Sequence, residues 1–233
     1  MVDLAILVIL ALCVLAGYYR GTIYAAINFG VTVFALLLAL LLIPTASSVI
    51  KNSDRLYKGM LYYFEGYEYV SSTNVEQVHA VAADVPAEEL NDLIERAEMP
   101  IPMGSAVQKN IRRLAYAEKG ISTLGDYFNQ TIVDVVINIL SMLVLFVILR
   151  ILMGWILRTF DVSLEGFPVM NRYDGVFSCG IGFLHGVLFV YTLFLLVPVL
   201  LTVVPRLETF LNDSLFGGFF YHVNPLLYLV PTT

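Results

Sequence analysis

Four long apolar stretches dominate the pattern of hydrophobic and polar positions along the chain. They cover about residues 4–19, 22–43, 132–149 and 175–204. A helix of about 20 apolar residues spans the ~30 Å hydrocarbon core of a bilayer, so each stretch predicts a membrane-crossing helix. Two runs of 30 and 31 residues, 21–50 and 175–205, contain no charged side chain at all. We therefore predict an all-α integral membrane protein with four transmembrane helices.

Short connections pair these helices into two hairpins. Only the segment from Tyr18 to Gly21 separates the first two helices, and Pro44 is expected to end the second because proline lacks a backbone N–H. Pro198 predicts a kink in the fourth helix. The predicted organisation is a transmembrane hairpin over residues 1–43, a helical loop over 44–131, a second transmembrane hairpin over 132–204 and a C-terminal tail over 205–233.

The central loop is too long to lack structure, since a stretch of 88 residues without helices or strands is unusual in a compact protein. Residues 54–69 are rich in tyrosine, which predicts a helix that either lies in the headgroup layer or packs on other loop helices. Two amphipathic helices are expected after it. One opens at Asp84-Val85-Pro86 and ends at Pro100, and the other runs from Ser105 to Gly120 with Val107, Ile111 and Leu114 inward.

The first of these amphipathic helices carries five carboxylates. They are Glu88, Glu89, Asp92, Glu95 and Glu98. A cation site is one interpretation, but acidic residues at this spacing far more often form the solvated face of a helix. We expect the solvated face.

Basic residues in the short connections give the predicted orientation. Arg20 lies in the first turn, and Arg158 and Arg172 flank the turn between the third and fourth helices, on the same side of the membrane. The positive-inside rule places these turns in the cytoplasm, so both termini and the loop over 44–131 are predicted to be extracytoplasmic. The 8 basic and 12 acidic residues of that loop have little influence, because long loops cross the membrane regardless of their charge.

Composition narrows the function classes. The chain is 59% hydrophobic and 14% charged, with a net charge of −6, which excludes a water-soluble domain and argues against a nucleic-acid partner. Cys13 and Cys179 both lie in apolar runs and form neither a CxxC pair nor a zinc-ligand spacing. The sequence also lacks GxSxG, HExxH and GxxxxGK[ST] motifs. We expect no catalytic residues, no metal and no cofactor.

Polar residues inside the predicted spans are the candidates for a site. Asp134, Asn138 and Ser141 follow i, i+4, i+7 spacing and share one stripe of the third helix, while His185 lies near the middle of the fourth. The stripe is either a polar path for ions or a hydrogen-bonded seam between helices, and we favour the seam. His185 is either a proton relay or a neutral structural residue, and we favour the structural role.

Small residues at four-residue spacing predict helix packing. Ser178, Gly182 and Gly186 form such a series in the fourth helix, and Ala26 and Gly30 form one in the second. Small side chains let two helix backbones approach closely. We expect the second and fourth helices to pack through these faces, or one face to mediate a homodimer.

The two hairpins also resemble each other, since Arg20 precedes Gly30 by ten residues and Arg172 precedes Gly182 by ten. This spacing predicts a two-plus-two repeat with the loop inserted between the halves.

Three segments resemble the colicin V production protein family, CvpA. They are Asp3-Leu4 at the start of a short apolar helix, the turn Gly17-Tyr18-Tyr19-Arg20-Gly21, and the segment from Asn171 to Phe177 that leads to Gly180, Gly182, His185 and Gly186. By this resemblance Arg20, Gly21, Arg172 and Gly175 match the family pattern. The 88-residue loop is longer than the family's usual loop.

The resemblance implies a four-helix protein of the bacterial inner membrane that is an accessory to toxin production or export and to envelope physiology. Its expected partners are the lipid bilayer and either further copies of the chain or other membrane proteins. The alternative is a small oligomeric channel or transporter, with Asp134, Asn138, Ser141 and His185 lining a path between helices.

Overall fold

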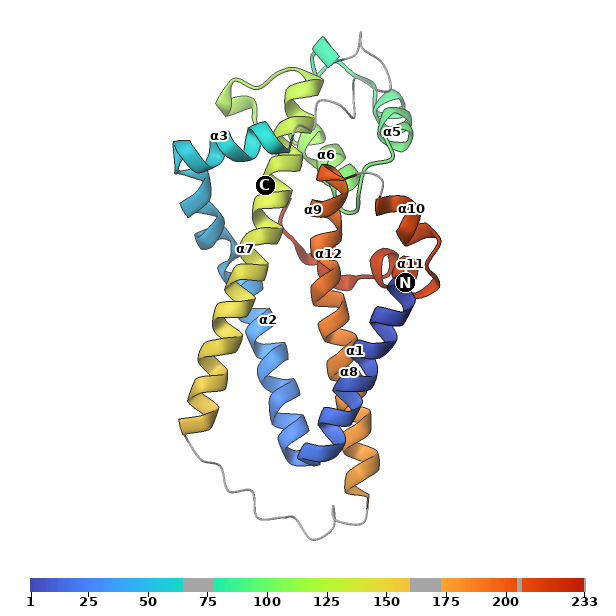
Figure 1. The fold of residues 1–233 in the computed structure, drawn as a ribbon. Coiled ribbons are helices and arrows are strands. Elements are labelled where there is room, and N and C mark those ends of the chain that lie inside the picture. Colours follow the sequence, from blue (N-terminus) through green and yellow to red (C-terminus); the bar gives the residue numbers. More distant parts are fainter. Residues whose placement is uncertain (65–77, 160–172, 205–206, 233) are drawn as a thin grey trace. The chain divides into compact units, whose positions relative to one another are not determined.

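The computed structural model describes residues 1–64, 78–159, 173–204 and 207–232. Four candidate spans are long and apolar enough to cross a membrane (Figure 1). They are α1 (Val2–Arg20), α2 (Thr22–Lys51), α7 (Leu124–Thr159), and α8 (Asp174–Phe194) with α9 (Leu196–Val203). Within the described ranges the only β-structure is an isolated antiparallel bridge between Val81 and Thr123. The all-α prediction with four candidate spans is confirmed.

The spans leave large apolar side chains exposed. Leu41 is 76% exposed on α2, Trp155 is 73% exposed on α7, and Leu4 is 64% exposed on α1. Such a surface is unfavourable in water, because contiguous exposed apolar patches on soluble proteins are small. Lipid tails cover the same surface without this cost, so the four spans suit a membrane environment.

The prediction that Pro44 ends the second helix is wrong. Pro44 lies inside α2, which continues to Lys51. Proline removes one backbone hydrogen bond, but a membrane helix tolerates the loss when nearby groups satisfy the backbone. The carbonyl that loses its donor is that of Leu40, one turn before Pro44, and α2 continues past it; the Ser47 hydroxyl donates to the carbonyl oxygen of Pro44 itself at 3.3 Å. The extension matters because it carries Lys51 into the polar cluster described below.

The third and fourth spans also differ from their predicted bounds. α7 begins at Leu124 rather than near Ile132, so Asp134 lies well inside the helix. The last span is interrupted at Leu195, between α8 and α9, and Pro198 falls in the first turn of α9. Proline is tolerated in a first turn because its missing N–H would have no partner there. The predicted kink is therefore a helix break three residues before the proline.

The chain divides into two compact units, and the first contains residues 1–42, 142–195 and 208–226. In this unit α1 and α8 lie side by side and run antiparallel (Figure 1). At one end Asp3 accepts hydrogen bonds from the hydroxyl of Ser214 at 2.7 Å and from the backbone N–H of Phe216 at 2.8 Å. Asp3 thus attaches the start of α1 to α11 (Leu215–His222).

The segment over 205–233, predicted as a tail, contains short helices. Besides α11, it forms α10 (Leu207–Asn212) and α12 (Pro225–Leu229). These helices are five to eight residues long. Their length is too short to give a clear periodic signal in sequence, which explains why they were missed.

The second unit contains residues 43–141, 196–207 and 227–233. It includes the loop helices α3 (Asp54–Tyr63), α5 (Ala87–Arg96) and α6 (Met103–Arg112), and the short 3₁₀ helix η2 (Ala117–Lys119). A hydrophobic core joins α5 and α6 to the start of α7, and it consists of Val78, Ala82, Leu90, Leu93, Val107, Ile111, Tyr116, Leu124, Tyr127 and Phe128. The loop therefore has a packed core of its own.

The predictions for the loop helices are mostly confirmed. α5 matches the helix expected between Pro86 and Pro100, but α6 ends at Arg112 instead of continuing to Gly120. Leu114, predicted inward, has a φ of 48° and is 44% exposed, since the chain turns there. α3 buries none of its residues, and the part of the predicted aromatic helix beyond Phe64 lies outside the described residues.

Candidate functional site

Two of the three segments that carry the family resemblance, the turn that ends at Gly21 and the segment with Asp174, lie next to each other in the first unit. The side chain of Asp174, at the start of α8, accepts the backbone N–H of Thr22 through Oδ1 at 2.9 Å. In return, the Thr22 hydroxyl donates to the backbone carbonyl of Asp174 at 2.9 Å. These two bonds join the first turn of α2 to the first turn of α8. We call this contact the turn junction.

Glycines allow the turn junction to close. Gly21 alone separates α1 from α2, and its φ of 79° lies in the region that favours glycine. A Cβ at Gly175 would lie 3.1 Å from the ring of Tyr18. The predicted motif residues Gly21 and Gly175 thus lie at one junction with Tyr18. Arg172, the remaining motif arginine, lies outside the described residues.

The small-residue face of α8 packs on α1 and not on α2. A Cβ at Gly182 would lie 2.6 Å from the carbonyl oxygen of Cys13, and one at Gly186 would lie 3.0 Å from the Cβ of Cys13. Ser178 is buried, and its carbonyl oxygen faces Gly17. Within the chain this face therefore packs on α1 instead of the second helix, and the alternative, that one small-residue face mediates a homodimer, stays a prediction.

Ala26 and Gly30 are both exposed, and nothing lies within 4 Å of a Cβ built at Gly30. The partner on α1 has its own sequence signal. Cys13, Gly17 and Gly21 also recur every four residues, and this series offers α8 a matching small face.

A cavity of about 160 Å³ lies beside this helix contact. Its lining consists of Cys13, Ala16, Gly17, Arg20, Tyr24, Ala25, Asn28, Gly182 and His185. Arg20 lies over the ring of Tyr24, 5.3 Å from its centroid. The sequence pattern pointed to Arg20, Gly182 and His185 separately, whereas the contributions of Cys13, Tyr24 and Asn28 were missed.

Arg150 of α7 lies behind the cavity wall in the same unit. Its Nε donates to the Thr32 hydroxyl at 3.1 Å, and its Nη2 donates to Oδ1 of Asn28. Both acceptors are neutral. Arg150 is half-buried, so its positive charge is held close to Asn28 and the cavity.

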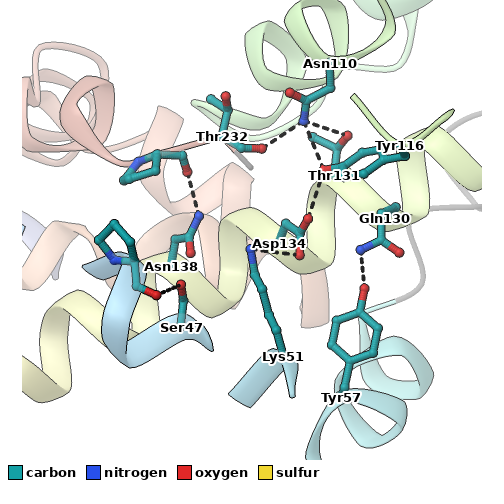
Figure 2. Close-up of polar contacts among 12 residues, drawn as sticks. Ser47, Lys51, Tyr57, Asn110, Tyr116, Gln130, Thr131, Asp134, Asn138 and Thr232 are labelled. Atoms are coloured by element: carbon teal, nitrogen blue, oxygen red, sulfur yellow. Dashed lines mark hydrogen bonds and ion pairs between the residues drawn. The ribbon is translucent and has the colours of Figure 1, made fainter. Parts of the chain in front are cut away.

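The second unit contains a buried polar cluster around Asp134 (Figure 2). Asp134 is 1% exposed, and its Oδ1 lies 3.2 Å from Nζ of Lys51 at the end of α2. Its Oδ2 accepts a hydrogen bond of 3.0 Å from the Tyr116 hydroxyl. A buried carboxylate is costly unless it is paired and hydrogen-bonded, and here both oxygens have partners. We call Lys51, Asp134 and Tyr116 the Asp134 cluster.

Amides extend the cluster to the C-terminal residues. Nδ2 of Asn110 lies 3.1 Å from the Tyr116 hydroxyl and 3.2 Å from the Thr131 hydroxyl, and it donates to the carbonyl of Thr232 at 2.8 Å. Nδ2 of Asn138 donates to the carbonyl of Pro231 at 2.9 Å. Figure 2 shows these contacts converging on one side of α7. They tie the loop and the end of the chain to the same helix.

Tyr116 acts as a donor in this setting. Burial, and then the neighbouring charge of Asp134, raises the pKa of the Tyr116 hydroxyl well above its ordinary value. The hydroxyl therefore stays protonated at neutral pH and can donate to the Asp134 carboxylate. This geometry favours the hydrogen-bonded seam over a path that exchanges ions with solvent.

The four polar residues predicted as a possible path do not share one environment. Asp134 and Asn138 lie in the cluster of the second unit, whereas His185 lines the cavity of the first. Ser141 is buried, and among the described residues its hydroxyl has no hydrogen-bond partner.

The described part of the chain contains no group of three His, Cys, Asp or Glu side chains placed to hold a metal. Both Cys13 and Cys179 are free thiols. The chain matches no known protein-family model, no curated protein and no solved structure. Its function must be argued from the residues and their geometry.

Proposed function

We propose that this chain is a non-enzymatic protein of the bacterial inner membrane that assists toxin production or export and envelope physiology, as the CvpA resemblance implies. The observation that carries the proposal is the turn junction. Thr22 and Asp174 are 152 residues apart in sequence and exchange two hydrogen bonds. Two of the three segments that resemble the family therefore lie next to each other, as they would if they formed one functional element.

The Asp134 cluster supports an accessory role. Its carboxylate and its ammonium group neutralise each other, and the neighbouring amides of Asn110 and Asn138 hold the carbonyls of Thr232 and Pro231. Such a cluster fixes a loop domain to a membrane helix, which suits a protein that presents a surface to partners. Further copies of the chain or other membrane proteins are the proposed partners.

The antiparallel pair α1 and α8 supports the proposed orientation of the chain in the membrane. Asp3 contacts Ser214 at one end of this pair, and Thr22 contacts Asp174 at the other. The N-terminus and the segment at Ser214 are then expected on one side of the membrane and the turn with Arg20 on the opposite side. Since basic turns stay in the cytoplasm, we place the termini and the loop outside it.

A complementation experiment tests this function. The chain is expressed in a bacterium that lacks its own CvpA protein and carries the genes for colicin V. We expect secreted toxin activity to be restored, and Asp174→Ala to reduce it severalfold because both helix starts lose the carboxylate that joins them. The matched control is Asp213→Ala, which removes an exposed acid outside the turn junction. Wild-type chain present in the membrane at normal abundance without any toxin secretion would contradict the proposal.

One observation favours the channel or transporter as a second candidate function. Asp134 and Lys51 form a buried titratable pair within candidate spans, and ionisable residues in such positions often mark ion pathways. Purified chain in liposomes would then conduct protons or alkali cations, and Asp134→Asn would abolish the flux. Absence of flux for H⁺, Na⁺ and K⁺ across the pH range would exclude this candidate.

A further inference from the structure

The cavity of the first unit gathers hydrogen-bond donors without any acid. Arg20, Asn28 and His185 line it together with Tyr24, and no lining residue is a carboxylate. Gly17 and Gly182 lack side chains and leave room inside it. A volume of about 160 Å³ is several times the ~30 Å³ that one water occupies, so a phosphate group can enter.

Arg150 determines which way the side-chain amide of Asn28 is oriented at this cavity. The guanidinium donates to Oδ1 of Asn28, so this atom must be the amide oxygen. The NH₂ group of the same amide has no hydrogen-bond partner in the described ranges. Asn28 therefore offers two N–H donors beside Arg20 and His185.

The charge near the cavity is positive. Within the described residues, neither Arg20 nor Arg150 forms an ion pair with a carboxylate. Asp174, the acid at this end of α8, already accepts the N–H of Thr22. Two guanidinium groups with neutral partners favour an anion, and the planar fork of arginine matches phosphate oxygens in pairs.

We infer that this cavity binds a phosphate-bearing anion, and that its source is the headgroup of an anionic phospholipid. The lining helices carry exposed apolar side chains such as Leu12 on α1 and Phe183 on α8, as expected for surfaces in contact with lipid. Basic pockets between membrane helices on the cytoplasmic side suit anionic headgroups. The inference goes beyond the proposed role in toxin export and stands without it.

Native mass spectrometry of the purified full chain tests the lipid preference. The chain is incubated with equal amounts of phosphatidylglycerol and phosphatidylcholine. We expect phosphatidylglycerol to be retained about tenfold more, as one charge-assisted contact predicts. Arg20→Gln and Arg150→Gln should each reduce this preference severalfold. Arg113→Gln, which removes an exposed cation in the loop, should leave the preference unchanged.

Cys13 provides a second readout that leaves both arginines intact. In a Cys179→Ala chain, the Cys13 thiol in the cavity wall should react more slowly with a small maleimide when phosphatidylglycerol is present than with phosphatidylcholine alone. Slowing by inorganic phosphate but not by phosphatidylglycerol would keep the anion site and assign it to a soluble phosphate compound. Equal retention of both lipids, together with a Cys13 rate that neither phosphatidylglycerol nor phosphate changes, would overturn the inference.

Discussion

Asp134→Leu is expected to lower the free energy of unfolding by up to about 3–5 kcal/mol, because it leaves the partly buried Lys51 ammonium without its partner. The side chains of Asp134 and Lys51 are 2% and 22% exposed, so water cannot replace the lost carboxylate easily. The Tyr116 hydroxyl would lose its acceptor as well. Equilibrium unfolding in mixed micelles measures the change.

Two controls separate charge pairing from general damage. The exposed pair Asp54 and Lys58 lies 3.9 Å apart, and Asp54→Leu should change stability little because solvent screens that pair. The double variant Lys51→Met with Asp134→Leu should recover most of the loss, since neither charge is then buried alone. Equal losses for Asp54→Leu and Asp134→Leu would show that the Asp134 cluster does not stabilise the chain.

Gly182→Ala is expected to destabilise the contact between α1 and α8 by about 1–3 kcal/mol, as overpacking does in tightly packed interiors. The new methyl group would lie 2.6 Å from the carbonyl oxygen of Cys13 and 3.1 Å from Cα of Val14. These are backbone atoms that cannot rotate away, so the two helices must separate. A lower midpoint of thermal unfolding in detergent reports the loss.

Gly180→Ala is the matched control on the same helix. Nothing lies within 4 Å of a Cβ at this position, so the substitution should leave packing unchanged and gain up to about 1 kcal/mol of helix propensity. The two alanine variants should therefore shift the midpoint in opposite directions. If both variants shift the midpoint of thermal unfolding with the same sign and size, α8 does not contact α1 closely at Gly182.

Apolar length was enough to predict the four candidate spans, since few other structures use such long uncharged stretches. Proline was a weaker guide. Pro44 does not end α2, because proline removes only one backbone hydrogen bond and a membrane helix can continue past it. Amphipathic spacing identified α5 well, but the short helices after residue 206 had no such signal.

The candidate site could be predicted only in part. The family resemblance pointed to Gly21 and Gly175, and both lie next to the turn junction. Contacts between distant segments could not be found in this way. Lys51 and Asp134 are joined only because α2 extends past Pro44, and the carbonyl of Thr232 reaches Asn110 from the far end of the chain.

We propose that the turn with Arg20 and the loop over 44–131 lie on opposite sides of the bilayer, as the positive-inside rule and four crossings imply. Single cysteines at Tyr19, which is 82% exposed beside Arg20, and at the exposed Ala117 of η2 test it in a chain with Cys13→Ala and Cys179→Ala. In spheroplasts treated with an impermeant maleimide, Ala117→Cys should be labelled at once and Tyr19→Cys only after the membrane is permeabilised. Labelling of Tyr19→Cys from outside, or of both positions from one side, would contradict the account.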